Sequence, residues 1–308
     1  MMRASFVLLL AAAACSPFAP APRPSLEPDA GTPETGPVPP GNVGFGGGTA
    51  DRLYFAVTGD TRPGACDATD QYPTAAITQI AASMKALKVQ FALDLGDHMF
   101  VCNNSVAEAQ QQMGFYTTAI AGGPSTWWMS MGNHECGSAY AGSGCATGTP
   151  DANFDVFMAA LKRPKPWYST EVQTSAGLAR FVFVADDAWS DEQAKWLEAT
   201  LSDADQNARY TIVSRHHPVS GSRTGSAVII KAIVGHKFTL LLTAHEHAYA
   251  HDPKLYGGRT AIVGIGGGPS SAPPGFGTIM QNTDGSMTFV LRDLTGNPAG
   301  TPWTVQPQ

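Results

Sequence analysis

Two stretches of sequence decide the fold: LYFAVTGD at residues 53–60 and VQFALDLGD at residues 89–97. Each is a short run of apolar, β-branched and aromatic residues that ends in Gly-Asp, which is typical of a buried strand followed by a turn. The residues between them, 73–88, carry apolar side chains at helical spacing and begin with Pro73, which suits the first turn of a helix. This strand–helix–strand order predicts an α/β fold.

The same alternation continues along the chain. We expect further helices over residues 104–120, 152–162 and 225–234, and one that begins at Ser190, where Ser190 and Gln193 resemble a capping box. The predicted strands are 127–131, 179–185, 210–214 and 238–243, followed by 259–265, 277–281, 286–292 and 301–305. Mixed βα units followed by strands predict a sandwich of two sheets with helices outside.

The composition excludes several classes of protein. The chain has 308 residues, of which 43% are hydrophobic, and this suffices for one large domain with a substantial core. The net charge of −6 argues against a nucleic-acid-binding protein, which would carry a basic face. An anionic small substrate is compatible with this charge, because a bound metal supplies local positive charge. No apolar run reaches the roughly 18 residues of a membrane-spanning helix.

The N-terminus has the pattern of an export signal. Residues 1–15 combine Arg3, a short apolar stretch and an Ala-Ala-Ala-Cys sequence ending at Cys15, which resembles the lipobox of bacterial lipoproteins. The alternative is an ordinary secretory signal cleaved near Ala14. We therefore expect an exported protein that is lipid-anchored in the bacterial outer membrane or periplasm, or else secreted, and that meets a membrane only through the lipid.

Residues 16–50 hold nine prolines and seven glycines and almost no large apolar side chains. Such a stretch cannot bury enough surface to offset its ordering entropy, so we interpret it as a disordered tether with a flexible joint at Gly46-Gly47-Gly48. The folded domain is then predicted to span residues 51–308.

Four cysteines remain if Cys15 carries lipid, and an even number in an exported chain predicts two disulfides. Cys136 and Cys145 flank a Gly/Ser-rich loop and are expected to pair, which leaves Cys66 to pair with Cys102. The alternative is that some of these thiols stay free and buried.

Polar residues follow five of the predicted strands. They are Gly59-Asp60, Gly96-Asp97, Gly132-Asn133-His134-Glu135, Arg215-His216-His217-Pro218 and Ala244-His245-Glu246-His247. Sites in open α/β sheets form outside the carboxyl ends of strands, so these side chains are expected at one rim. Carboxylate, amide and imidazole groups are ligands for Zn, Mn or Fe. Each motif alone is weak, but their conjunction predicts a metal site.

In this order the motifs resemble those of the calcineurin-like metallophosphoesterase superfamily, which includes the purple acid phosphatases. The resemblance covers residues 52–268. It implies a four-layer α/β/β/α sandwich of two mixed sheets flanked by helices, holding two metal ions (Mn, Fe or Zn). It also implies that the first metal is bound by Asp60 and His247, that Asp97 bridges both metals, and that the second is bound by Asn133, His216 and His245. His134 would contact the phosphate or protonate the leaving group.

Three positions depart from the superfamily pattern. Arg62 stands where the histidine of an Asp-x-His motif is expected, and a guanidinium has no lone pair to offer a metal. Phe100 stands where purple acid phosphatases have a tyrosine ligand, and Ala244 replaces a glycine. The first metal would then be held by Asp60, Asp97, His247 and water, or by His98, or would bind weakly. Arg62 is expected either to contact a substrate phosphate or to form a structural ion pair.

The resemblance implies hydrolysis of a phosphate ester, such as a phosphorylated small molecule, by a metal-bound hydroxide outside the cytoplasm. His134, held by Glu135 or a neighbour, would protonate the departing alkoxide, and Asp186 and Asp187 would support a ligand histidine. Two alternatives stay open because of Arg62 and Phe100. One is a degenerate member of the fold that binds a ligand without turnover, and the other is a one-metal hydrolase.

Overall fold

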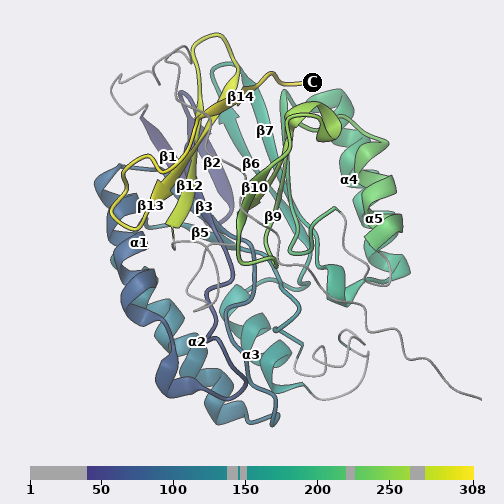
Figure 1. The fold of residues 1–308 in the computed structure, drawn as a ribbon. Coiled ribbons are helices and arrows are strands. Elements are labelled where there is room, and N and C mark those ends of the chain that lie inside the picture. Colours follow the sequence, from purple (N-terminus) through teal and green to yellow (C-terminus); the bar gives the residue numbers. More distant parts are fainter. Residues whose placement is uncertain (1–39, 137–144, 146–150, 220–225, 264–274) are drawn as a thin grey trace, which may run out of the picture. The chain divides into compact units, whose positions relative to one another are not determined.

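The computed structural model describes residues 40–136, 145, 151–219, 226–263 and 275–308. The predicted signal sequence and most of the predicted tether lie outside these residues. The described residues form two mixed β-sheets with helices on their outer faces (Figure 1). None of the helices in this part of the chain is long and apolar enough to span a membrane.

The six-stranded sheet contains the first predicted strand–helix–strand unit. Its order is β14-β13-β12-β3-β4-β5. These strands are β3 (Tyr54–Thr58), β4 (Phe91–Asp94), β5 (Trp127–Met129), β12 (Gly275–Gln281), β13 (Met287–Asp293) and β14 (Trp303–Val305). β3, β4 and β5 are parallel, so their carboxyl ends lie at one edge of the sheet.

The eight-stranded sheet has the order β1-β2-β6-β7-β8-β9-β11-β10. Its strands are β1 (Gly41–Gly44), β2 (Gly47–Ala50), β6 (Tyr168–Thr174), β7 (Gly177–Phe183), β8 (Tyr210–Ser214), β9 (Leu240–Thr243), β10 (Tyr249–His251) and β11 (Thr260–Val263). β7, β8, β9 and β11 are parallel neighbours, which again brings carboxyl ends together.

Five α-helices occur in the described residues: α1 (Thr74–Ala86), α2 (Val106–Ile120), α3 (Ala152–Leu161), α4 (Asp191–Asn207) and α5 (Ser226–Val234). Short 3-10 turns lie at Thr69–Gln71, Asp186–Ala188 and Leu255–Gly258. The predicted cap of α4 is present, since the Ser190 hydroxyl accepts from the backbone N–H of Gln193.

Three apolar clusters hold the layers together. α1 packs on the outer face of the six-stranded sheet through a cluster that includes Ile80 and Met84. α4 and α5 pack on the outer face of the eight-stranded sheet, and Figure 1 shows them side by side there. Between the sheets, Phe91 stacks on Phe55 and meets the edge of Phe181 at 5.3 Å. The expected four-layer α/β/β/α sandwich is therefore confirmed.

The start of the folded domain differs from the prediction. Residues 41–50 were assigned to the tether, but they form the β1–β2 hairpin, and β2 pairs in parallel with β6. Gly47 is not a flexible joint, because its φ of 103° and the backbone of Glu171, 2.1 Å from where a Cβ would lie, both require glycine. Composition alone misses this hairpin because its stability comes from a strand more than a hundred residues away.

Both expected disulfides are present. Cys66 pairs with Cys102 and Cys136 with Cys145, with Cα–Cα distances of 5.7 and 5.1 Å. The first of them links the segment after β3 to the segment after β4. These segments carry Asp60 and Asp97, so the disulfide restricts how far the two carboxylates can move apart.

Candidate metal centre

The carboxyl ends of five parallel strands deliver the predicted ligands. Asp60 follows β3, Asp97 follows β4 and Asn133 follows β5, while His216 follows β8 and His245 follows β9. All of these except His245 are buried. The sandwich therefore brings residues from both sheets to one rim, as the strand-end motifs predicted.

The backbone is strained at four of the six predicted ligands. Asp60, Asp97, His245 and His247 have positive φ values of 56°, 62°, 73° and 48°. Such left-handed conformations cost free energy for residues other than glycine, and they cluster at functional sites. Four such residues at one rim indicate that the required positions of their side chains, rather than the backbone preferences of Asp and His, determine the local conformation.

One group of ligands, which we call the second metal site, consists of Asp97, Asn133, His216 and His245. The Oδ1 atom of Asn133 lies 3.1 Å from Nε2 of His216 and 2.9 Å from Nδ1 of His245. Nε2 of His216 is also 3.3 Å from Oδ2 of Asp97. Asp97, His216 and His245 were found to offer ligand atoms within 4.8 Å of one another.

The tautomer of His216 supports metal binding at this site. Nδ1 of His216 lies 2.8 Å from the carbonyl oxygen of Leu95 and must donate to it. In the neutral ring, Nε2 then presents a lone pair to the oxygens of Asp97 and Asn133. Burial would lower the pKa of His216, but the Asp97 carboxylate outweighs it and raises the pKa to about 10. The site thus attracts a cation, and this donor set suits a divalent metal.

A second group, which we call the first metal site, consists of Asp60, Asp97 and His247, whose ligand atoms also lie within 4.8 Å of one another. Oδ2 of Asp60 and Nδ1 of His247 are buried and have no hydrogen-bond partner. Burial raises the pKa of Asp60 to about 7, with the Asp97 charge acting in the same direction. Asp97 belongs to both groups, which is the bridging position that the superfamily resemblance implies.

Arg62 reaches into the first metal site. Its Nε donates to Oδ2 of Asp97 at 3.3 Å, and its Nη2 lies 3.1 Å from Nε2 of His247. Because a guanidinium has only donors, Nε2 of His247 accepts here. Burial, and then the Arg62 charge, lower the pKa of His247 to about 4.

His134 lies beside Asp97 and has little solvent exposure. Its backbone N–H donates to Oδ1 of Asp97 at 3.0 Å, and its ring Nε2 is 3.8 Å from Oδ2 of the same carboxylate. Its ring also packs against Phe100, with ring centroids 4.0 Å apart. Burial lowers the pKa of His134 to about 4, although the Asp97 charge acts in the opposite direction.

Glu135 has a different role from the one predicted. It does not hold His134; instead its buried carboxylate accepts from the backbone N–H groups of Asp97, His98 and Gly132 at 2.9, 2.6 and 2.6 Å. It thereby ties the turn after β4 to the turn after β5. Sequence reasoning missed this role because the three donors belong to the backbone and leave no trace in the pattern of side chains.

His98 is excluded as a metal ligand in this conformation. Its ring is fully buried, with Nδ1 3.2 Å from Glu135 and Nε2 3.1 Å from Asp94. These two carboxylates overcome the effect of burial and raise the pKa of His98 to about 10. His98 is therefore a buried ion-pair residue that supports the turn carrying Asp97.

Asp186 and Asp187 both contact His217, which is not one of the predicted ligands. Asp187 is 2.7 Å from Nε2 of His217, whose ring lies 4.4 Å from that of His245. Asp186 accepts from the backbone N–H of His217 and pairs with the buried Arg215. No motif in the sequence indicated the role of Arg215, whose ion pair with Asp186 holds the segment after β8.

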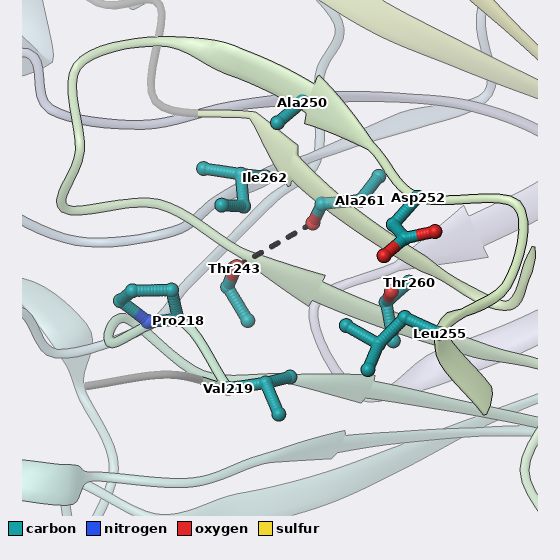
Figure 2. Close-up of a pocket in the computed structure, with 9 residues that line it drawn as sticks. All are labelled: Pro218, Val219, Thr243, Ala250, Asp252, Leu255, Thr260, Ala261 and Ile262. Carbon is teal, nitrogen blue, oxygen red and sulfur yellow. Dashed lines mark hydrogen bonds between the residues drawn. The ribbon is translucent and has the colours of Figure 1, made fainter.

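A cavity of about 180 Å³ lies near this rim (Figure 2). It is bordered by Pro218, which follows the His216-His217 pair, and by Thr243, which precedes His245 by two residues. Its lining residues are Pro218, Val219, Thr243, Ala250, Asp252, Leu255, Thr260, Ala261 and Ile262. Among them only Asp252 is charged, and its charge is negative, so this cavity does not suit a phosphate group.

Comparisons with solved structures show the same fold. A purple acid phosphatase from yellow lupin (Lupinus luteus) is 17% identical with a TM-score of 0.56, covering 83% of this chain and 54% of the lupin chain. A dimetal phosphatase from Danio rerio is 13% identical with a TM-score of 0.55, covering 83% and 99%. GAP50, described as the anchor in the inner membrane complex of Plasmodium, is 15% identical with a TM-score of 0.55, covering 83% and 89%.

The chain thus spans about half the length of the lupin enzyme. A comparison with curated protein sequences found no match. The sequence profile of the calcineurin-like phosphoesterases matches residues 53–249, which is more than half of the chain and contains every predicted ligand. The resemblance seen in the strand-end motifs is therefore confirmed, and the chain belongs to the calcineurin-like phosphoesterase family.

Proposed function

We propose that this protein hydrolyses a phosphate ester with the help of metal held at the second metal site. The observation that carries this proposal is the convergence of Asp97, Asn133, His216 and His245 with their ligand atoms directed at one another. The Asp97 charge among these lone pairs favours a cation at this position, as the raised pKa of His216 also shows for a proton. Membership of the family supports the same reaction class.

The side chains at the rim have different roles in the proposed reaction. A bound metal would supply a Lewis acid that lowers the pKa of water and neutralises charge on phosphoryl oxygens. Asp97 and Asn133 hold that position from β4 and β5, and the Leu95 carbonyl orients the His216 ring. His134 lies next to Asp97 at the rim, where its ring can donate a hydrogen bond to a phosphoryl oxygen. Because its pKa is about 4, it can protonate the leaving oxygen only if the charge of the bound phosphate raises that pKa. Arg62 adds a fixed positive charge beside the same carboxylate.

We further propose that the bound metal is Mn, Fe or Zn, and that the substrate is a phosphorylated small molecule or another phosphoester. Export is also part of the proposal, with a lipid anchor at Cys15. The signal-like residues 1–15 support it, as do the two disulfides, because disulfides persist in oxidising compartments outside the cytoplasm.

Hydrolysis of aryl phosphate monoesters and diesters tests the reaction. We expect the full chain to lose turnover after chelation and to regain it with Mn²⁺, Zn²⁺ or Fe²⁺. His245→Ala should lose activity because it removes a ligand, and His134→Ala should lose it while still binding metal. His236→Ala is the matched control. This histidine lies between α5 and β9, pairs with Asp205 of α4 and does not contact either metal site.

A second candidate function is ligand binding without turnover. The replacement of two usual ligand positions by Arg62 and Phe100 favours it, because the first metal site then lacks part of its donor set. Folded wild-type protein that binds metal at the second metal site but hydrolyses none of these esters would support this candidate and contradict the enzyme proposal.

A further inference from the structure

The first metal site is already occupied by a positive group from the protein itself. The guanidinium of Arg62 makes hydrogen bonds to Oδ2 of Asp97 and Nε2 of His247 at 3.3 and 3.1 Å. Asp97 and His247 are two of the three residues that offer ligand atoms at this site, and Nε2 of His247 also lies 3.8 Å from Oδ1 of the third, Asp60. A metal ion bound there would have to displace both hydrogen bonds.

Two further contacts hold the guanidinium in place. Its Nη1 donates to the backbone carbonyl of Pro63 at 2.9 Å, and its Cζ lies 4.6 Å from the centroid of the Phe100 ring. The side chain of Arg62 is only 13% exposed. Phe100 thus stacks on the arginine at the position where a tyrosine ligand would serve a metal, so the two departures from the family pattern act as a pair.

The positive charge of Arg62 makes it unfavourable for a metal ion to bind at the first metal site beside the guanidinium. A guanidinium stays protonated at all accessible pH values and cannot become a ligand, so a metal ion at the first metal site would lie beside a permanent positive charge. The conflict is weaker at the second metal site, where Arg62 contacts Oδ2 of Asp97 but none of the other three residues. None of the hydrogen bonds of Arg62 goes to Asn133, His216 or His245, and Asp97 can accept from Arg62 while facing His216.

We propose that this chain binds a single metal ion, at Asp97, Asn133, His216 and His245, and that the guanidinium of Arg62 replaces the other metal of the dinuclear centre. This inference rests on the proposed function, since it assumes that the second metal site binds metal. In this proposal, Arg62 is the positive group that contacts the phosphoryl oxygens of the substrate on the side opposite the metal ion. Asp60 keeps an unpartnered buried oxygen, Oδ2, so the first metal site retains one donor that a different residue at position 62 could use.

Metal content measured by mass spectrometry after chelation, reloading with Mn²⁺ and dialysis tests this proposal without reference to turnover. We expect one metal ion per wild-type chain and two per Arg62→His chain, because a histidine at this position supplies a lone pair in place of the charge. His247→Ala should still bind one ion, whereas His245→Ala should bind none. Arg259→His is the matched control, since Arg259 donates to the backbone of Gln306 instead, and it should bind one ion.

Electron paramagnetic resonance of the Mn²⁺-loaded chains gives a second readout. The wild type should show an isolated Mn²⁺ signal, and Arg62→His should show a coupled pair. Two ions per wild-type chain, or no gain in folded Arg62→His, would overturn the inference while leaving the proposed function intact. No metal in folded wild-type protein would overturn the proposed function itself.

Discussion

Replacing Gly132 by alanine is expected to abolish metal binding at the second metal site. A Cβ at this position would lie 2.3 Å from Oδ1 of Asp97 and 2.4 Å from the Asp97 backbone nitrogen. Neither atom can move freely, because Glu135 accepts from this nitrogen and the His134 N–H donates to this oxygen. The bridging carboxylate would be displaced, at a cost of about 1–3 kcal/mol of folding free energy, typical of overpacking.

Metal titration and thermal unfolding of the same variant check this expectation. Gly114→Ala is the control, because a Cβ at Gly114 in α2 meets no atom within 4 Å. It should bind metal normally and gain roughly 0.5–1 kcal/mol of stability from the better helix propensity of alanine. Normal metal affinity in Gly132→Ala would show that Asp97 need not hold its present position.

Replacing Asp97 by asparagine is expected to reduce phosphoester hydrolysis by more than about 100-fold, since even residues that only support a metal ligand are worth 10–100-fold. An asparagine can keep the hydrogen bond that Oδ1 accepts from His134. It removes the negative charge, however, and can place an amide N–H donor against His216 and Arg62 where Oδ2 now lies. The effect should therefore appear in metal affinity rather than in folding.

Parallel measurements of metal affinity, turnover and circular dichroism separate these effects. Asp70→Asn, at an exposed position in the 3-10 turn Thr69–Gln71, is the matched control and should behave as wild type. If folded Asp97→Asn retained wild-type affinity and turnover, Asp97 would not be the residue that bridges the two metal sites.

The strand ends were predictable from sequence because the signal is local. An apolar run followed by Gly-Asp shows both the strand and its turn within eight or nine residues, as at 53–60 and 89–97. Gly132 and Gly96 then allow adjacent strand ends to approach closely: a Cβ at Gly96 would lie 2.4 Å from the Gly132 nitrogen. Local chemistry and close approach thus bring the ligands to one rim.

Features that depend on distant partners were not predictable. The β1–β2 hairpin is glycine-rich and gains its stability from pairing with β6. The position of Arg62 depends on His247, 185 residues away, and on the ring of Phe100. The sequence indicates that Arg62 stands at the position of a usual metal ligand. Only the three-dimensional contacts show that its guanidinium donates to Asp97 and His247, two residues of the first metal site.

Anomalous diffraction from crystals of the wild-type protein loaded with Mn²⁺ or Zn²⁺ tests the central claim most directly. We expect an anomalous peak within bonding distance, about 2.0–2.2 Å for zinc, of ligand atoms from Asp97, Asn133, His216 and His245. A metal-loaded crystal with no peak among these four side chains would contradict the account, because the hydrolysis proposed here requires a metal at that position.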